Sequence, residues 1–277
     1  MAIYTQDYRE WKGKYRKRPY KLMGIVSFGI KRAWSSKWVK ISIILGWIVP
    51  VFFIVLSLFS PAMIKESLKN GENSFFADFF SLQMLWTILL TATAGSSLIS
   101  EDIENKSITL YYSSPIEKID YFLGKMGIIG CIISLTTVLP STVVYWALVL
   151  ISDLPVKGRL WVWGASVLNS AVLIIFLGLL ILFLSSLMKN SKYSGASFFG
   201  FIFGSGVVAG ILYEVTGNKW IILLSIIDNL NIIREKIFRI TMERPIEWYY
   251  SPLLIIGMTI FFGVFSFMRL RKMELSE

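Results

Sequence analysis

Side chains that could carry out chemistry are few in this sequence. Its 277 residues contain no histidine, the commonest general base near neutral pH and the commonest metal ligand. The one cysteine, Cys131, lies inside an apolar run, where it is expected to be a small buried hydrophobic residue. Asp78, Glu214 and Asp228 lie at the ends of apolar runs, and no two acids lie close together within one. We therefore predict no catalytic residue and no metal site, and an enzyme is the weaker interpretation.

A phosphate-binding loop of the Gly-x-x-x-x-Gly-Lys-Ser/Thr type is also missing from the sequence. The nearest match is Gly124-Lys125, which lacks both the upstream glycine and the hydroxyl residue that should follow. The chain is therefore not expected to cradle ATP, and we predict no cofactor of its own.

The densest group of charged side chains follows the second apolar run. Ser100 is a candidate N-cap, and Glu101, Asp102 and Glu104 would then lie in the first helical turn, where the helix dipole favours anions. Because the residue before a proline avoids the helical region, Pro115 should end this segment in an extended stretch or a turn. The pattern predicts a short acidic helix with a proline-ended tail, and a solvated connector is the alternative.

The elements that must position this group are apolar helices. Hydrophobic residues make up 55% of the sequence and charged residues 17%, with a mean hydropathy of +0.63. Soluble domains carry roughly a quarter charged residues, and a bilayer core needs roughly 20 apolar residues per helix. Six runs reach that length, at residues 39–60, 79–100, 125–151, 161–187, 194–213 and 250–268. We predict an all-α polytopic membrane protein with six transmembrane helices.

The distribution of basic residues sets the predicted orientation. Four alternating segments carry 19 of the 28 Lys and Arg residues. These segments are residues 1–40, 101–125, 188–193 and 269–277. Because basic loops face the cytoplasm, both ends of the chain are expected on the cytoplasmic side of the plasma membrane. We divide the chain into a basic cytoplasmic segment with an interfacial helix, 1–38, and a transmembrane domain, 39–277.

The first forty residues mix basic and aromatic side chains. Nucleic-acid-binding proteins also combine basic and aromatic side chains. A basic cluster beside a membrane segment, however, favours binding to anionic lipid headgroups. Apolar residues between Leu22 and Trp34 fall roughly on one side of a helix, as in a helix that lies in the membrane interface. Membrane lipids, and no nucleic acid, are therefore the expected partners of this segment.

The segment 214–249, predicted to lie outside, has an apolar pattern of its own. Leu230, Ile233, Ile237 and Ile240 recur at helical spacing, and Glu235 with Arg239 could pair on another face. The pattern predicts an amphipathic helix before the last span. The short run 220–227 is too short to span a bilayer and is interpreted as a re-entrant or interfacial piece.

Prolines and small residues mark where helices should bend or pack. Pro50 and Pro140 fall in the first and third runs and are expected to kink them. The second run ends in small hydroxyl residues, which suit either hydrogen bonds between helices or a partly wet path. Glycines of the fifth run predict close helix packing, within the chain or against a second chain. These glycines are Gly200, Gly204, Gly206 and Gly210.

The segment with the acidic helix resembles the signature loop of the type-2 ABC transporter permeases. In that family an acidic pair, Thr-Leu, a Ser/Thr-Pro turn and a closing Gly-Lys recur. The corresponding residues here are Glu101-Asp102, Thr109-Leu110, Ser114-Pro115 and Gly124-Lys125. Ile108 departs from the pattern, because the family usually has glycine before Thr-Leu, and this leaves the end of the helix open.

The resemblance implies a permease subunit of an ABC exporter. The acidic helix would be a coupling helix that seats in a groove of a cytoplasmic ATPase. Its contact residues would be Glu101, Asp102, Glu104, Asn105, Thr109, Leu110, Ser114 and Pro115. Two ATPase subunits, which bind ATP and Mg²⁺, would drive two permeases that meet at their first and fifth spans and move a substrate outward.

A secondary transporter or channel without an ATPase partner is the alternative, although the charged spans or internal repeat expected of one are missing. The sequence leaves open the substrate, the residues that line its path, and whether the second permease is identical or a paralogue.

Overall fold

The computed structural model describes residues 18–59, 74–107, 117–151, 160–240 and 246–273, and every element in these ranges is a helix. Within them, six helices are long and apolar enough to cross a membrane. They are Lys37–Phe59, Ser74–Glu104, Lys118–Ile151, Leu160–Leu187, Ser191–Thr216 and Tyr250–Arg271. The predicted all-α, six-span architecture is confirmed.

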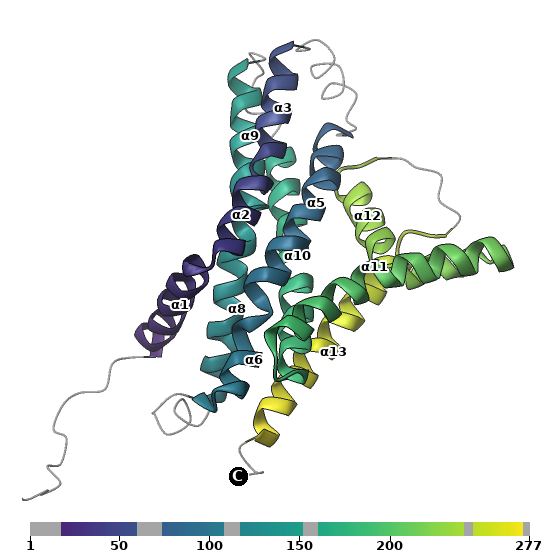
Figure 1. The fold of residues 1–277 in the computed structure, drawn as a ribbon. Helices are drawn as coiled ribbons and strands as arrows, with labels where there is room; N and C mark the ends of the chain where they lie inside the picture. The colour runs from purple at the N-terminus through teal and green to yellow at the C-terminus, as the bar shows by residue number, and fades with distance from the viewer. Residues whose placement is uncertain (1–17, 60–73, 108–116, 152–159, 241–245, 274–277) are drawn as a thin grey trace, which may run out of the picture.

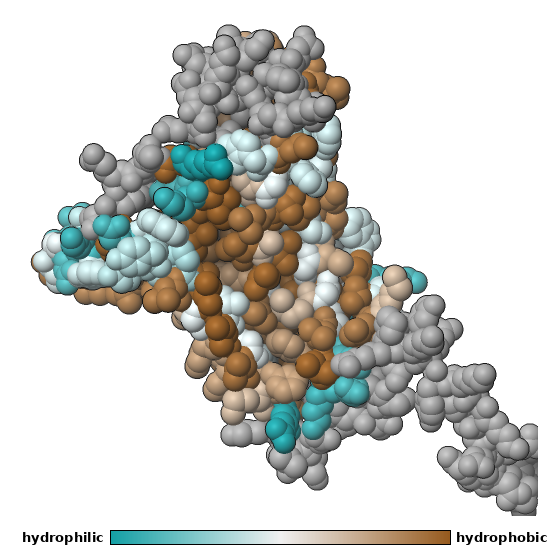
Figure 2. Space-filling model, turned by 180° about the vertical axis from the view of Figure 1, so that it is seen from behind, coloured by the Kyte–Doolittle hydropathy of each residue, from teal (hydrophilic) through white to brown (hydrophobic). Residues whose placement is uncertain are grey.

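The fourth span, α10 (Leu160–Leu187), is the centre of the bundle. It packs against parts of all the other spans except the first, and its Leu177, Leu180 and Ile181 are fully buried. The interfacial helix α1, the helix α6 and the end of α13 lie at one end of the bundle, called the α6 end below, and α3 and α9 lie at the other (Figure 1). Hydrophobic residues cover most of the side of the bundle between these ends (Figure 2).

Three spans are each built from two helices. The first is α2 (Lys37–Gly46) and α3 (Ile48–Phe59), and the third is α8 (Lys118–Ser134) and α9 (Val138–Ile151). Pro50 and Pro140 lie in the first turns of α3 and α9, just after the breaks, which confirms the predicted kinks. The second span consists of α5 (Ser74–Gly95) and α6 (Ser97–Glu104).

The N-terminal helix α1 (Arg18–Ser35) lies at an angle beside the α6 end and packs on α8 (Figure 1). Its contact with α8 depends on small residues: an added Cβ on Gly29 would clash with Ile128, and one on Gly124 would lie 2.7 Å from Ile25. Met23 is 72% exposed on the outer side. The predicted helix is present, and its place in the membrane interface and the boundary at residue 38 stay predictions.

Replacing Gly29 with alanine is expected to loosen α1 from α8. The new Cβ would lie 2.6 Å from Cγ1 of Ile128, a buried residue that has little room to move. Because overpacking costs about 1–3 kcal/mol, the Tm of the detergent-solubilised chain should fall by roughly 3–10 °C. Gly24→Ala is the matched control, since a Cβ at Gly24 meets no atom within 4 Å. Equal shifts in the two variants would contradict this packing.

The fifth span, α11 (Ser191–Thr216), extends away from the bundle toward its C-terminal end (Figure 1). Gly217, with φ 65°, ends it, and the 3₁₀ helix η2 (Lys219–Leu224) and α12 (Ile226–Ile237) follow before α13 (Tyr250–Met273). The short run predicted over 220–227 is therefore divided between η2 and α12.

The amphipathic helix predicted before the last span is α12, but it is shorter than the apolar pattern suggested. It ends at Ile237, so Ile240 lies beyond it. Arg239 has φ 58° and its guanidinium lies 4.5 Å from the ring centroid of Trp161 on α10, a cation–π contact in place of the pairing expected along the helix.

Candidate functional site

The second span breaks at Ser96, and a serine of α10 holds the break together. Ser185 Oγ accepts hydrogen bonds from the backbone N–H groups of Ile99 (3.1 Å) and Ser100 (2.9 Å). The same hydroxyl donates to the Ser96 carbonyl at 2.9 Å. Ser185 is fully buried, so it satisfies backbone groups that no water could reach. The α6 segment is thereby fixed to the central helix.

The predicted N-cap at Ser100 is wrong. Ser100 lies inside α6, and its hydroxyl donates to the Ser96 carbonyl at 2.6 Å. Glu101 and Asp102 consequently lie in the last turn of α6, where the helix dipole disfavours anions. The acidic pair therefore needs cations or hydrogen-bond donors from other elements.

Asp102 obtains these partners mainly from α8. One carboxylate oxygen accepts from the Tyr121 hydroxyl at 2.8 Å and from Lys125 Nζ at 2.6 Å. The other oxygen accepts from the Ser107 hydroxyl at 3.2 Å. The side chains of Asp102 and Lys125 are 3% and 7% exposed, so this is a buried, hydrogen-bonded ion pair between α6 and α8.

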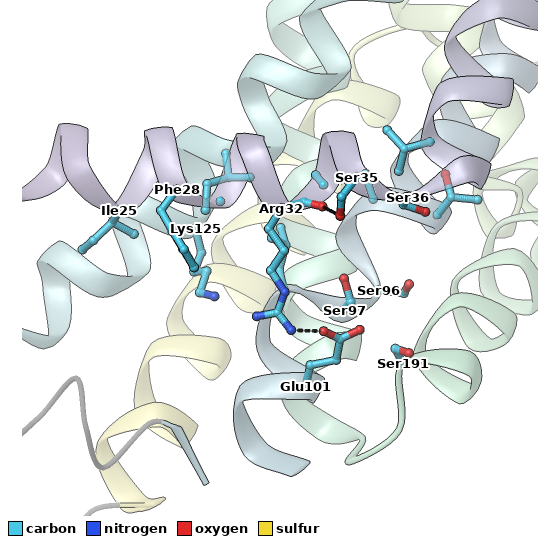
Figure 3. A pocket seen from close by; sticks show the side chains of 17 residues that line it. Ile25, Phe28, Arg32, Ser35, Ser36, Ser96, Ser97, Glu101, Lys125 and Ser191 are labelled. Atoms are coloured by element: carbon cyan, nitrogen blue, oxygen red, sulfur yellow. Dashed lines mark hydrogen bonds and ion pairs between the residues drawn. The ribbon is translucent and has the colours of Figure 1, made fainter. Parts of the chain in front are cut away.

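Glu101 obtains its partner from α1. The Arg32 guanidinium donates to the Glu101 carboxylate (Figure 3). Its second terminal nitrogen lies 3.8 Å from Asp102. The Arg32 and Glu101 side chains are 49% and 31% exposed, so solvent weakens this pair. Arg32, Glu101, Asp102, Tyr121 and Lys125, called the charged network below, join three elements that are far apart in the sequence.

A cavity of about 370 Å³ lies beside the charged network, between α1, the break in the second span and the start of α11. Hydroxyl groups and three charged side chains face it (Figure 3). Its polar lining residues are Arg32, Ser35, Ser36, Thr93, Ser96, Ser97, Glu101, Lys125 and Ser191. The small hydroxyl residues noticed at the end of the second span therefore border a polar hollow at the α6 end as well as contacting other helices.

The other residues predicted for the acidic helix are less defined. Glu104 ends α6 and Asn105 caps it, and both are exposed. Thr109, Leu110, Ser114 and Pro115 lie outside the described residues.

Gly124, the glycine of the Gly-Lys pair, is buried against Ile25 of α1 and precedes Lys125 of the charged network.

The glycines of α11 do not pack closely within the described part of the chain. Among the described residues, an added Cβ on Gly200, Gly204 or Gly210 would meet no atom within 4 Å, and one on Gly206 would make an ordinary contact, 3.6 Å from the Ser225 hydroxyl. The described residues therefore give no close packing at three of the four, and the predicted packing against a second chain stays a prediction.

Sequence reasoning missed the cationic side of the charged network. Arg32 lies 69 residues from Glu101, and a separation of that size leaves no trace in local patterns. Lys125 did give a signal: a lysine at the start of a long apolar run needs a carboxylate partner, and Asp102 was an available one.

The fold and this site define a multi-pass α-helical membrane protein with a charged network at one end. A family model described as ABC-2 family transporter protein matches residues 65–275, which is most of the chain. The chain therefore belongs to this family of ABC transporter permeases, whose members are membrane transport subunits that associate with an ATP-binding partner. No curated protein matches the chain in a sequence comparison.

Proposed function

We propose that this chain is the permease subunit of an ATP-driven exporter and that its ATPase docks on the α6 end. In this proposal the α6 end faces the cytoplasm, both termini lie there, and two ATPase subunits supply ATP and Mg²⁺. A substrate is moved outward when the ATPases close.

The observation that carries the proposal is the way α6 is tied to the bundle. Ser185 joins its first half to α10, and in its last turn Lys125 joins it to α8 and Arg32 joins it to α1. A solvated connector would bend under a push from a partner. A helix that is bonded on three sides instead passes the push to several spans, as a coupling segment must.

The surface offered to the partner is the exposed tip of this segment. Glu104 and Asn105 are exposed there, and Lys106, with φ 54°, turns the chain sharply. Glu101 and Asp102 point back into the charged network, so their role in coupling is to hold the tip in place. Direct contact with the ATPase is assigned to Glu104, Asn105 and the predicted stretch from Thr109 to Pro115.

A second permease chain is proposed to cover α11 and the first span. Val207 and Ile211 of α11 are 61% and 59% exposed, and Ile44 of α2 is 67% exposed. The open glycines of α11 would let another helix approach closely.

The buried ion pair is the one observation that favours a secondary transporter or channel instead. Charged residues inside spans often line ion or proton paths. Asp102, however, lies at the end of the bundle, and both of its oxygens already have donors. We therefore assign the pair a structural role.

Copurification tests the proposed function. The tagged chain is extracted from its native membrane in mild detergent, and proteins that come with it are identified by mass spectrometry and assayed for ATP hydrolysis. An ATPase should accompany the wild type and decrease at least about tenfold with Glu104→Arg/Asn105→Arg, because the first change reverses a charge at the docking surface and the second adds one. Lys219→Glu, exposed in η2, is the control and should retain the ATPase. Wild-type chain that brings down no ATPase would favour the secondary transporter or channel.

A further inference from the structure

Two prolines free one backbone carbonyl each, in two different spans. Proline has no N–H to donate to the carbonyl four residues earlier. Pro50 therefore leaves the Gly46 carbonyl of the first span without its helical donor, and Pro140 does the same to the Thr136 carbonyl of the third. Both carbonyls lie at the helix breaks, which are inside the bundle.

One side chain of the second span serves both carbonyls. Gln83 Nε2 donates to the Gly46 carbonyl at 3.1 Å and to the Thr136 carbonyl at 2.8 Å. An amide nitrogen carries two hydrogens, so each carbonyl can receive its own. Gln83 is fully buried. Among the described residues its Oε1 has no hydrogen-bond partner, so the hydrogen bonds of this side chain go to the two breaks.

Small and hydroxyl-bearing residues around Gln83 let the two breaks and α5 lie close together. An added Cβ on Gly46 would lie 3.1 Å from Thr136 Cγ2 and 3.6 Å from Gln83 Nε2, so glycine permits the two breaks to approach each other. The Thr87 hydroxyl, one turn from Gln83, lies 3.4 Å from the Thr136 hydroxyl. The two breaks and α5 therefore meet at a single point.

The packing on either side of this point differs. Beyond the breaks, α3 and α9 pack against each other. Before the breaks, the two helices differ in their main neighbours: α2 packs chiefly on α5, whereas α8 packs on α1, α10 and α5. Beyond the breaks, α3 and α9 therefore form a helix pair that also contacts α5 and α10, and Gln83 binds where this pair continues into α2 and α8.

We propose that Gln83 is a positioning residue for transport: it ties the proline breaks of the first and third spans together, so that α3 and α9 tilt as one unit against α5. The contact of Gln83 with the Gly46 and Thr136 carbonyls is called the joint below. The use of this joint in transport rests on the proposed function.

A double-mutant cycle tests whether Gln83 acts through the two carbonyls. Gln83→Met keeps the length of the side chain but leaves both carbonyls unsatisfied, and the Tm of the purified chain should fall by about 5–10 °C. In a Pro50→Ala/Pro140→Ala background the backbone N–H groups return, and Gln83→Met should lower the Tm by less than half as much. Thr91→Val, which removes a buried α5 hydroxyl bonded only to its own helix at 2.7 Å, is the control and should have a small effect in both backgrounds. An equal drop from Gln83→Met in both backgrounds would overturn the proposal.

Distances between spin labels give a readout that a loss of stability alone would not produce. Cys131 is exposed, so its predicted burial was wrong, and it is first replaced by serine. In this background, cysteines replace the exposed Phe59 of α3, Leu150 of α9 and Ser74 of α5 in pairs. In Gln83→Met, the 59–74 and 150–74 distance distributions should both broaden while the 59–150 distribution stays narrow. Unchanged distributions, or broadening of one pair to α5 alone, would overturn the joint. If the joint behaves as expected but added ATP and the copurified ATPase shift neither distance to α5, its proposed role in transport fails while the joint stands.

Discussion

Replacing Asp102 with alanine is expected to lower the free energy of unfolding by about 3–5 kcal/mol, because it leaves the Lys125 ammonium buried without its carboxylate. Tyr121 would lose its acceptor at the same time. Denaturant titration of the chain in mixed micelles, followed by tryptophan fluorescence, measures this change.

The neighbouring acid provides the control for this prediction. Glu101→Ala removes a carboxylate whose partner Arg32 is half exposed, so the expected cost is under about 1 kcal/mol. Asp102→Ala combined with Lys125→Met removes both buried charges and should recover a large part of the loss. Similar costs for Glu101→Ala and Asp102→Ala, or no recovery in the double variant, would show that the buried pair does not hold α6 in place.

The second large effect is expected at Gly204 of α11. Gly204→Leu should weaken the association of two permease chains at least about tenfold, because a larger side chain keeps the partner helix away. The fold of the single chain should not change, since a Cβ at Gly204 meets no atom within 4 Å. Single-molecule photobleaching of labelled chains in lipid nanodiscs counts the chains per particle.

Gly164→Leu is the matched control for the glycine prediction. Gly164 lies in α10, is exposed, and also has no atom within 4 Å of an added Cβ, but it lies outside the proposed seam. It should leave the number of chains per particle unchanged. If both leucine variants behave alike, α11 does not form the seam and the interface must be sought elsewhere.

The six spans could be predicted because hydropathy over about 20 residues is a strong local signal. The kinks followed from Pro50 and Pro140 for the same reason: a proline acts on its own helix, whatever surrounds it. What the sequence could not show is that one amide, on Gln83, satisfies both breaks. That contact depends on the arrangement of three spans in space.

The candidate site was predicted only in part. The acidic residues at 101–104 stood out, but the N-cap rule applied to Ser100 failed because Ser185, 85 residues away, binds its N–H group and lets the helix continue. Local capping rules assume that the residues at the start of a helix face solvent, and the start of α6 is instead buried against α10. The amphipathic helix before the last span was likewise predicted too long, since Arg239 turns away from α12 to stack on Trp161.

Photo-crosslinking tests the central claim, that the tip of α6 contacts an ATPase, most directly. A photoreactive amino acid replaces Glu104 at the exposed end of α6, and in a second variant it replaces Trp220, exposed in η2, which packs on α11 and α12. After irradiation of native membranes, position 104 should cross-link to an ATPase chain and position 220 should not. A cross-link to the ATPase from position 220 but none from position 104 would contradict the account.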